Sequence, residues 1–300
     1  MFDLLSFITE PLGYAFMVRG LIAALIVGVV CAVLGSYIVL RGMAFLGDAL
    51  AHAILPGVAV AYLLAGSNPL WLSVGALAAG GLTALGIGAI SRGGIKEDTA
   101  IGIMFAGMFA LGIAMISTVR SYTVDLTHFL FGNVLGVATS DLWLTGVFGT
   151  LVILVIFAFY KEFLVLSFDP LLARTLRLPA NFLNYLLLFL IAVTIVLSLQ
   201  TVGIALIAAM LVTPAATAFL LTRRLPVMMI LAATIGALSA VTGLYLSFYI
   251  NIASGPAIVL TCTFFFLLAF LFSPQQGLIK TRFKSRHLKS NGSEQQEQLI

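Results

Sequence analysis

The sequence predicts an all-α membrane protein, a polytopic transmembrane helical bundle with eight to nine spanning helices. Of its 300 residues, 62% are hydrophobic and only 9% are charged, whereas a soluble domain carries about 25% charged residues. The apolar segments mostly reach the roughly 20 residues that a helix needs to cross the hydrocarbon core. Because lipid cannot hydrogen-bond open backbone groups, these segments must be helical, and none has the alternating pattern of a membrane barrel.

Nine apolar segments follow one another along the chain, and the segment 49–66 is only marginally long enough to span. We expect one membrane domain over residues 1–275 and a basic, polar, disordered cytoplasmic tail over residues 276–300. Cys31 and Cys262 lie within apolar segments and are expected to be buried free thiols. The nine segments are 14–40, 49–66, 70–90, 99–119, 141–160, 181–200, 203–222, 227–249 and 256–273.

Lys and Arg concentrate in three loops and in the C-terminal tail, which together hold 12 of the 15 basic residues. By the positive-inside rule these regions lie in the cytoplasm, and two spans separate each consecutive pair of them. Nine spans place the N-terminus outside, and the count falls to eight if one early segment fails to cross. The basic residues are Arg92 and Lys96; Lys161, Arg174 and Arg177; Arg223 and Arg224; and Lys280, Arg282, Lys284, Arg286 and Lys289.

Two features predict how the helices pack. Gly and Ala recur densely, for example over residues 75–81 and 203–209, and small residues let helix backbones approach closely in lipid. Pro56 and Pro214 lie inside apolar segments and should kink or interrupt their helices.

Asp48 and His52 place a carboxylate and an imidazole inside an otherwise apolar segment. If the residues after Gly47 are helical, a spacing of four puts both side chains on one helix face. An ionisable residue at membrane depth is costly and usually faces a bundle interior or an aqueous path. One oxygen and one nitrogen ligand suit Mn²⁺, Fe²⁺ or Zn²⁺, so the pair predicts a transition-metal site in a transport path.

Structural roles are the alternative for this pair: Asp48 as a helix N-cap and His52 bonded to a neighbouring helix carbonyl. If Arg41 lies at the cytoplasmic edge, both residues are only a few turns inside the membrane. An early break of the first helix near Gly42 or Gly47 would relieve that shallow placement.

The loop 161–178 predicts a short amphipathic helix at the cytoplasmic surface. Asp169 is a good N-cap, Pro170 suits the first helical position, and leucines follow at helical spacing. Such a helix would dock into a partner's groove or lie on lipid headgroups. On the outer side, Asp125 and His128 could bind a cation in a vestibule or gate, or could cap a re-entrant segment with turn residues around it.

Four absences limit the function. The sequence has no P-loop, no His-Glu-x-x-His and no Gly-x-Ser-x-Gly, and it has no folded basic surface suited to nucleic acid. We therefore expect no enzymatic activity in this chain.

The chain resembles the permease subunit of bacterial ABC importers for manganese, zinc and iron, closest to the manganese type, between residues 10 and 275. Several motifs in order carry the resemblance. They are residues 40–43, 47–53, 55–59, 97–102, 125–126, 130–133, 167–170, 202–203, 214–217, 254–255 and 258–260.

This resemblance implies a homodimeric permease in a bacterial plasma membrane, a separate cytoplasmic ATP-binding subunit and an extracytoplasmic metal-binding protein. It also implies that Asp48 and His52 of both copies line the ion site. No cofactor would be bound permanently, because the ion is cargo: Mn²⁺, or alternatively Zn²⁺ or Fe²⁺. The ATPase would contact the region of Ser167, Phe168, Asp169, Pro170 and Arg174.

Two rival functions stay open on the sequence alone. A stand-alone proton-coupled metal transporter would use Asp48 and His52 as a proton relay and would need no ATPase. An intramembrane hydrolase is the other rival, and the segments hold few polar groups to support one.

Overall fold

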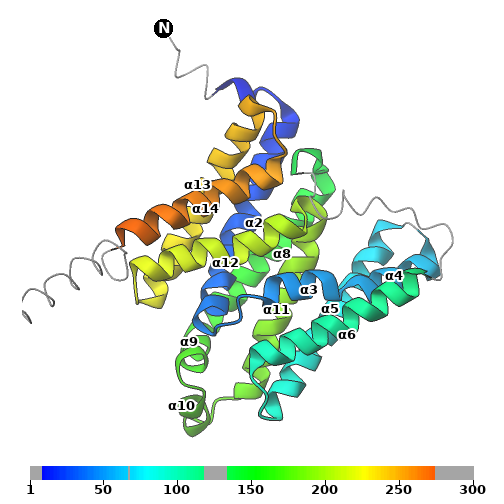
Figure 1. The fold of residues 1–300 in the computed structure, drawn as a ribbon, viewed down its shortest axis with the longest axis vertical. Helices are drawn as coiled ribbons and strands as arrows, with labels where there is room; N and C mark the ends of the chain where they lie inside the picture. The colour runs from blue at the N-terminus through cyan, green and yellow to red at the C-terminus, as the bar shows by residue number, and fades with distance from the viewer. Residues whose placement is uncertain (1–8, 67, 118–133, 274–300) are drawn as a thin grey trace, which may run out of the picture.

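The computed structural model describes residues 9–66, 68–117 and 134–273, and these residues form helices joined by short connections (Figure 1). The described part contains no strand. The helices are α2 (Ala15–Leu40), α3 (Leu46–Ala53), α4 (Leu55–Ala65), α5 (Pro69–Arg92), α6 (Glu97–Ser117), the 3₁₀ helix η1 (Val134–Gly136), α8 (Thr139–Ala158), α9 (Tyr160–Phe168), α10 (Pro170–Thr175), α11 (Ala180–Val202), α12 (Ile204–Leu221), α13 (Leu225–Ile250) and α14 (Ser254–Phe272).

Nine helical stretches within the described residues are long and apolar enough to cross a membrane. They coincide with the nine apolar segments of the sequence, so the predicted helical bundle is confirmed at the upper end of its expected count. The marginal segment gains length because α3 and α4 together form one stretch over Leu46–Ala65.

The spans form two groups of helices, and α11 packs against both groups. In the first group α2 lies between α12, α13 and α8, and α14 packs on α12 and α13. In the second group α3, α4, α5 and α6 pack on one another. Helix α11 contacts α5 on one side and α8 on the other, so it joins the two groups (Figure 1).

The chain breaks twice between α2 and α4. Helix α2 ends at Leu40, and Gly42 then adopts a left-handed φ of +70°, which costs glycine little. This is the early break that the sequence suggested, and it turns α3 sideways from the direction of α2 (Figure 1). A second break at Ile54 separates α3 from α4, because Pro56 disfavours continuous helix through the residues before it.

Pro214 does not interrupt its helix, contrary to one of the two outcomes expected for it. Helix α12 runs from Ile204 to Leu221 with Pro214 inside it. Proline removes one ladder hydrogen bond, whereas ending the helix in an apolar surrounding would leave several backbone groups without partners. Continuing the helix is therefore the less costly solution.

Glycines bring the helix backbones together, as the small-residue pattern predicted. A Cβ atom placed on Gly75 of α5 would lie 2.2 Å from the carbonyl oxygen of Gly57 on α4, and one placed on Gly35 of α2 would lie 1.8 Å from that of Leu211 on α12. Both contacts exclude any larger residue without a backbone shift.

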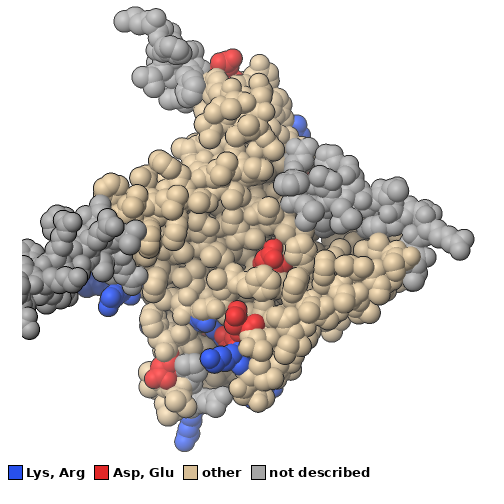
Figure 2. Space-filling model, in the orientation of Figure 1, with Lys and Arg blue, Asp and Glu red and all other residues tan. Residues whose placement is uncertain are grey.

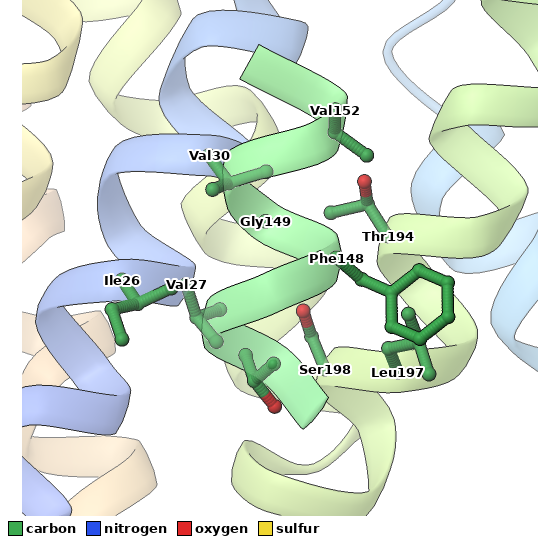
Figure 3. A pocket seen from close by; sticks show the side chains of 10 residues that line it. Ile26, Val27, Val30, Phe148, Gly149, Val152, Thr194, Leu197 and Ser198 are labelled. Atoms are coloured by element: carbon green, nitrogen blue, oxygen red, sulfur yellow. The ribbon is translucent and has the colours of Figure 1, made fainter. Parts of the chain in front are cut away.

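The hollow between α2, α8 and α11 has a volume of only about 10 Å³, room for one water at most. Side chains of these three helices fill the space around it (Figure 3). The hydroxyl of Thr194 in its wall donates to the Leu190 carbonyl of its own helix, so burial leaves that polar group satisfied. Cys31 and Cys262 are buried and free, as expected.

Charged side chains gather at one end of the bundle, where α9 and α10 lie, and the broad face above them is almost free of charge (Figures 1 and 2). The connections after α5, α8 and α12 carry the basic residues of the three loops. Two spans separate each consecutive pair of these connections, as the positive-inside argument requires.

Candidate metal site

Helix α3 carries the candidate ligands on the face opposite to its packing surface. Leu46 and Leu50 are fully buried, and Gly47 lies against Leu211 of α12. Asp48 and His52 point the other way, with side chains 42% and 23% exposed. Their positions in the first and last turns of α3 also suit the helix dipole, which favours an acid at the N-terminus and a base at the C-terminus.

The two candidate ligands lie close enough to share one ion. Nε2 of His52 is 3.7 Å from Oδ1 of Asp48, too far for a direct hydrogen bond. Metal bonds of about 2.1 Å from both atoms would span this gap at an angle of roughly 120°. The spacing of four residues therefore places an oxygen and a nitrogen ligand on one side of α3, as predicted.

The structural alternatives for this pair are not what is observed. The N-cap of α3 is Phe45, and Asp48 is the third residue of the helix. Among the described residues, neither side chain has a backbone hydrogen bond, so His52 is not fixed to a neighbouring carbonyl. Both ligand atoms are therefore available.

Aromatic rings of α6 hold the imidazole from the side. The ring centroid of His52 lies 5.5 Å from that of Phe109 and 6.1 Å from that of Phe105, both in edge-on geometry. Phe105 stacks on Phe109 and meets Phe45, which precedes α3, edge-on at 5.5 Å. Sequence reasoning missed this wall, although Phe105 and Phe109 at helical spacing could have pointed to it.

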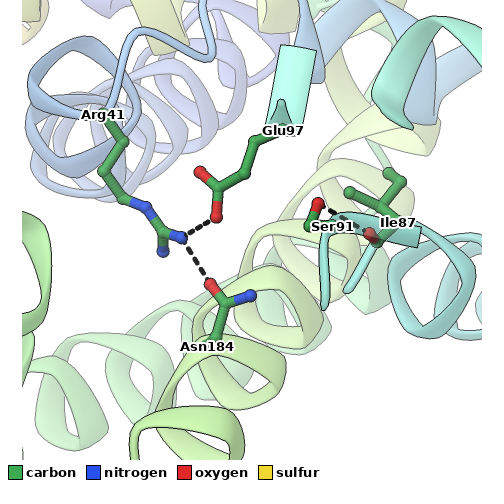
Figure 4. Close-up of polar contacts among 5 residues, drawn as sticks. All are labelled: Arg41, Ile87, Ser91, Glu97 and Asn184. Atoms are coloured by element: carbon green, nitrogen blue, oxygen red, sulfur yellow. Dashed lines mark hydrogen bonds and ion pairs between the residues drawn. The ribbon is translucent and has the colours of Figure 1, made fainter. Parts of the chain in front are cut away.

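A second polar cluster ties the helices of the site to α11. Arg41, directly after α2, donates through Nη2 to Glu97 at the start of α6 and to Asn184 of α11 (Figure 4). The Arg41 side chain is only 9% exposed. A cavity of about 140 Å³ adjoins the cluster. The cluster therefore connects Arg41, in the segment between α2 and α3, to Glu97 in the first turn of α6. Helix α6 also carries the aromatic rings beside His52.

In the described part of the chain, Asp48 and His52 are two potential metal ligands without a third beside them. Within the described ranges, no group of three or more His, Cys, Asp or Glu side chains is placed to hold a metal. Asp125 and His128, the candidates for an outer vestibule or gate, fall in residues 118–133, outside the described part. Asp48 and His52 thus leave further coordination positions to another source.

The short helix predicted within residues 161–178 is present as α10. Oδ1 of Asp169 accepts hydrogen bonds from the backbone N–H groups of Leu171 and Leu172 at 2.9 and 3.0 Å, which confirms Asp169 as an N-cap, and the helix begins at Pro170. Leu171 is 73% exposed. Phe168, the last residue of α9, is also exposed. Apolar side chains therefore lie on the surface where α9 meets α10.

The remaining docking candidates are placed only in part. Ser167 lies near the end of α9, and its hydroxyl is buried without a hydrogen-bond partner among the described atoms. The backbones of Pro170 and Arg174 lie on α10, and their side chains are outside the described part.

Comparison with known proteins identifies this architecture. The sequence model of the ABC 3 transport family matches residues 13–273, which is nearly all of the described bundle. The chain belongs to the ABC 3 transport family. It is therefore a transport subunit, and the resemblance noted from the sequence motifs is confirmed.

Named relatives of this ABC transport subunit cover it almost completely. It is 47% identical over 290 residues to the "Manganese transport system membrane protein MntC" of Halalkalibacterium halodurans, an alignment that spans 96% of this chain and 98% of the relative. It is 40% identical over 275 residues to the "Chelated iron transport system membrane protein YfeD" of Yersinia pestis, covering 90% of each chain.

A solved structure shares the fold of this family member. The chain superimposes on one from "PsaBC from Streptococcus pneumoniae in complex with Fab" with a TM-score of 0.79 and 42% sequence identity. The match covers 93% of this chain and 99% of the other. The helical architecture of the two proteins is therefore the same.

Proposed function

We propose that this chain is the membrane-spanning permease subunit of an ATP-driven importer of divalent transition-metal ions, with Mn²⁺ as the main cargo and Zn²⁺ or Fe²⁺ as alternatives. The observation that carries the proposal is the Asp48–His52 pair on α3, which is partly exposed and has no backbone partner. Oxygen and nitrogen ligands without sulfur suit these borderline and harder cations. The family and the manganese-named relatives support ATP-driven import.

The ion site forms between two copies of the chain in this proposal. One carboxylate and one imidazole leave the ion undercoordinated, and a second copy would bring two more ligands of the same kinds. Four ligands from two chains also suit transport, because moving the chains apart weakens binding and releases the ion. The homodimer is thus part of the mechanism.

ATP is bound and hydrolysed on a separate cytoplasmic subunit that docks on the α9–α10 region. The exposed Phe168 and Leu171 and the capped turn at Asp169 offer an apolar contact surface. ATP acts on the ion only by favouring one permease state over another, so this contact transmits the state of the ATPase. An extracytoplasmic protein delivers the metal to the opposite side, and the complex lies in a bacterial plasma membrane.

The ion site is tested by replacing its ligands with side chains of similar shape. Asp48→Asn and His52→Gln should each lower ⁵⁴Mn²⁺ uptake at least about tenfold in cells that depend on this importer. Asp141→Asn, which changes an acid in the first turn of α8, is the matched control and should transport normally. Wild-type uptake in both ligand variants, at equal membrane abundance, would refute the site.

Selectivity and energy coupling need separate measurements. Uptake of Mn²⁺ in competition with Zn²⁺ and Fe²⁺ identifies the cargo. Vesicles that contain this chain without the ATPase should not accumulate metal when given a proton gradient. Accumulation there would support the stand-alone proton-coupled transporter, for which family membership gives no support.

A further inference from the structure

An apolar groove runs between α2, α8 and α13 on the bundle, and neither the ion site nor the docking helix uses it. Its volume is about 420 Å³, within the range of ordinary ligand sites. Val33, Phe157 and Ile230 are among the side chains that line it. Phe157 and Ile230 are 64% and 66% exposed, so the groove is open on the side of the spanning helices.

The groove adjoins a second hollow at the charged end of the bundle. Tyr160 and Pro226 line both spaces, so the two hollows are neighbours. The second hollow, about 540 Å³, is lined by Arg223 and Arg224 from the connection between α12 and α13. Its lining also includes Phe168 and Asp169 of the proposed ATPase contact, so the lipid headgroup would lie beside that contact. Taken together, the two hollows are apolar along the spanning helices and basic where these helices end.

The two arginines are not neutralised by the protein. Both side chains are exposed, and in the described residues the ion pairs are those of Arg41 with Glu97 and of His52 with Asp48. Asp169 lines the same hollow, but its Oδ1 accepts two backbone hydrogen bonds. The hollow therefore keeps a net positive charge.

The sequence that follows the last described helix is basic. The hydroxyl of Ser273, just past α14, donates to the Leu220 carbonyl near the end of α12. The sequence that follows Ser273 holds five Lys or Arg residues and two Glu residues. Basic segments directly after a membrane span attract anionic lipid.

We propose that these two hollows together bind one anionic phospholipid of the cytoplasmic leaflet. An acyl chain lies in the groove between α2, α8 and α13, and the phosphate is held by Arg223 and Arg224. Tyr160 lies at the boundary between the two parts, where amphipathic rings are favoured. Guanidinium groups match phosphate geometry and bind it through two parallel hydrogen bonds.

Lipid retention by the purified full-length chain tests this site. The variant Arg223→Gln/Arg224→Gln should bind phosphatidylglycerol roughly 30-fold more weakly than the wild type, by the usual contribution of two basic residues near a membrane surface. Native mass spectrometry measures the bound fraction. Arg92→Gln/Lys96→Gln removes the same charge from another connection at the same end and should retain the lipid.

Further measurements distinguish an anionic lipid from a zwitterionic lipid and from free phosphate. Phosphatidylcholine with the same acyl chains should be retained less than phosphatidylglycerol, and inorganic phosphate should not displace the bound lipid. Ala233→Phe, which fills the groove wall, should expel the acyl chain. Because the arginine variant alters only exposed side chains, it keeps the test valid if Ala233→Phe fails to fold.

Three results would overturn the lipid site. Equal retention of the two lipids by wild type and arginine variant would reduce the groove to non-specific acyl contact. Displacement by inorganic phosphate would assign the arginines to a free anion. Unchanged lipid binding with weakened ATPase association would assign them to the partner subunit.

Discussion

Arg41 and Glu97 form an ion pair whose partners depend on each other. The Arg41 side chain is 9% exposed and that of Glu97 is 28% exposed. Glu97→Gln leaves the buried guanidinium without its counter-charge and should cost on the order of 3 kcal/mol of unfolding free energy. Adding Arg41→Gln removes the unpaired charge, so the double variant should recover part of that loss.

Thermal unfolding of the purified permease, followed by tryptophan fluorescence, measures both variants of this pair. A double variant that is less stable than Glu97→Gln alone would contradict the dependence of Glu97 and Arg41 on each other. Metal uptake adds a second readout, because the pair joins the segments that lead to the ion site and to its aromatic wall.

At the scale of single residues, the sequence predicted that Asp48 and His52 lie close together and missed the residues that surround them. Asp48 and His52 are four apart, so one helical turn suffices to bring them together. Arg41 and Asn184 are 143 positions apart, and no local pattern predicts such a contact. The same holds for Phe109 beside His52, which depends on how α6 packs against α3.

Helix α10 depends on its N-cap, and this dependence can be tested in the docking region. Asp169→Ala should remove the cap, which is worth about 1 kcal/mol, and should weaken association with the ATPase subunit. Asp169→Asn also caps helices well and should keep the association. Pull-down of the two subunits measures it, and loss of binding in Asp169→Asn would show that the charge, rather than the cap, is needed.

Contact between α4 and α5 is set by glycine. Gly75→Ala would place a Cβ atom 2.2 Å from the Gly57 carbonyl oxygen, whereas Gly81→Ala in the same helix would have its nearest neighbour at 3.9 Å. Overpacking should cost Gly75→Ala about 1–3 kcal/mol and Gly81→Ala little. Equal unfolding temperatures for the two variants would contradict the close packing.

At the level of elements, hydropathy located the spans, and the prediction that proline kinks or interrupts its helix left open which of the two outcomes each proline would have. Pro56 marks the break before α4, whereas α12 continues through Pro214. Proline forbids one hydrogen bond in both cases, and the surrounding packing decides whether the helix stops. That packing is not readable from the local sequence.

At the scale of the whole molecule, the nine candidate spans of the described residues predict that an odd number of crossings separates the α5–α6 connection from the α13–α14 connection. Cys31 and Cys262 are buried, so single cysteines can be added as reporters. Ile95→Cys between α5 and α6, 43% exposed at that position, should react with an impermeant thiol reagent only from the cytoplasm. Ile252→Cys between α13 and α14, 39% exposed, should react only from outside. Both reacting from the same side would exclude the nine-span arrangement.

The turn at Gly42 has a consequence for how such carriers diversify. It separates the eight residues of α3 from the long helix before them, so the two proposed ligands lie on a short helix of their own. Substitutions within that short helix can retune ion preference while the framework of the bundle stays the same.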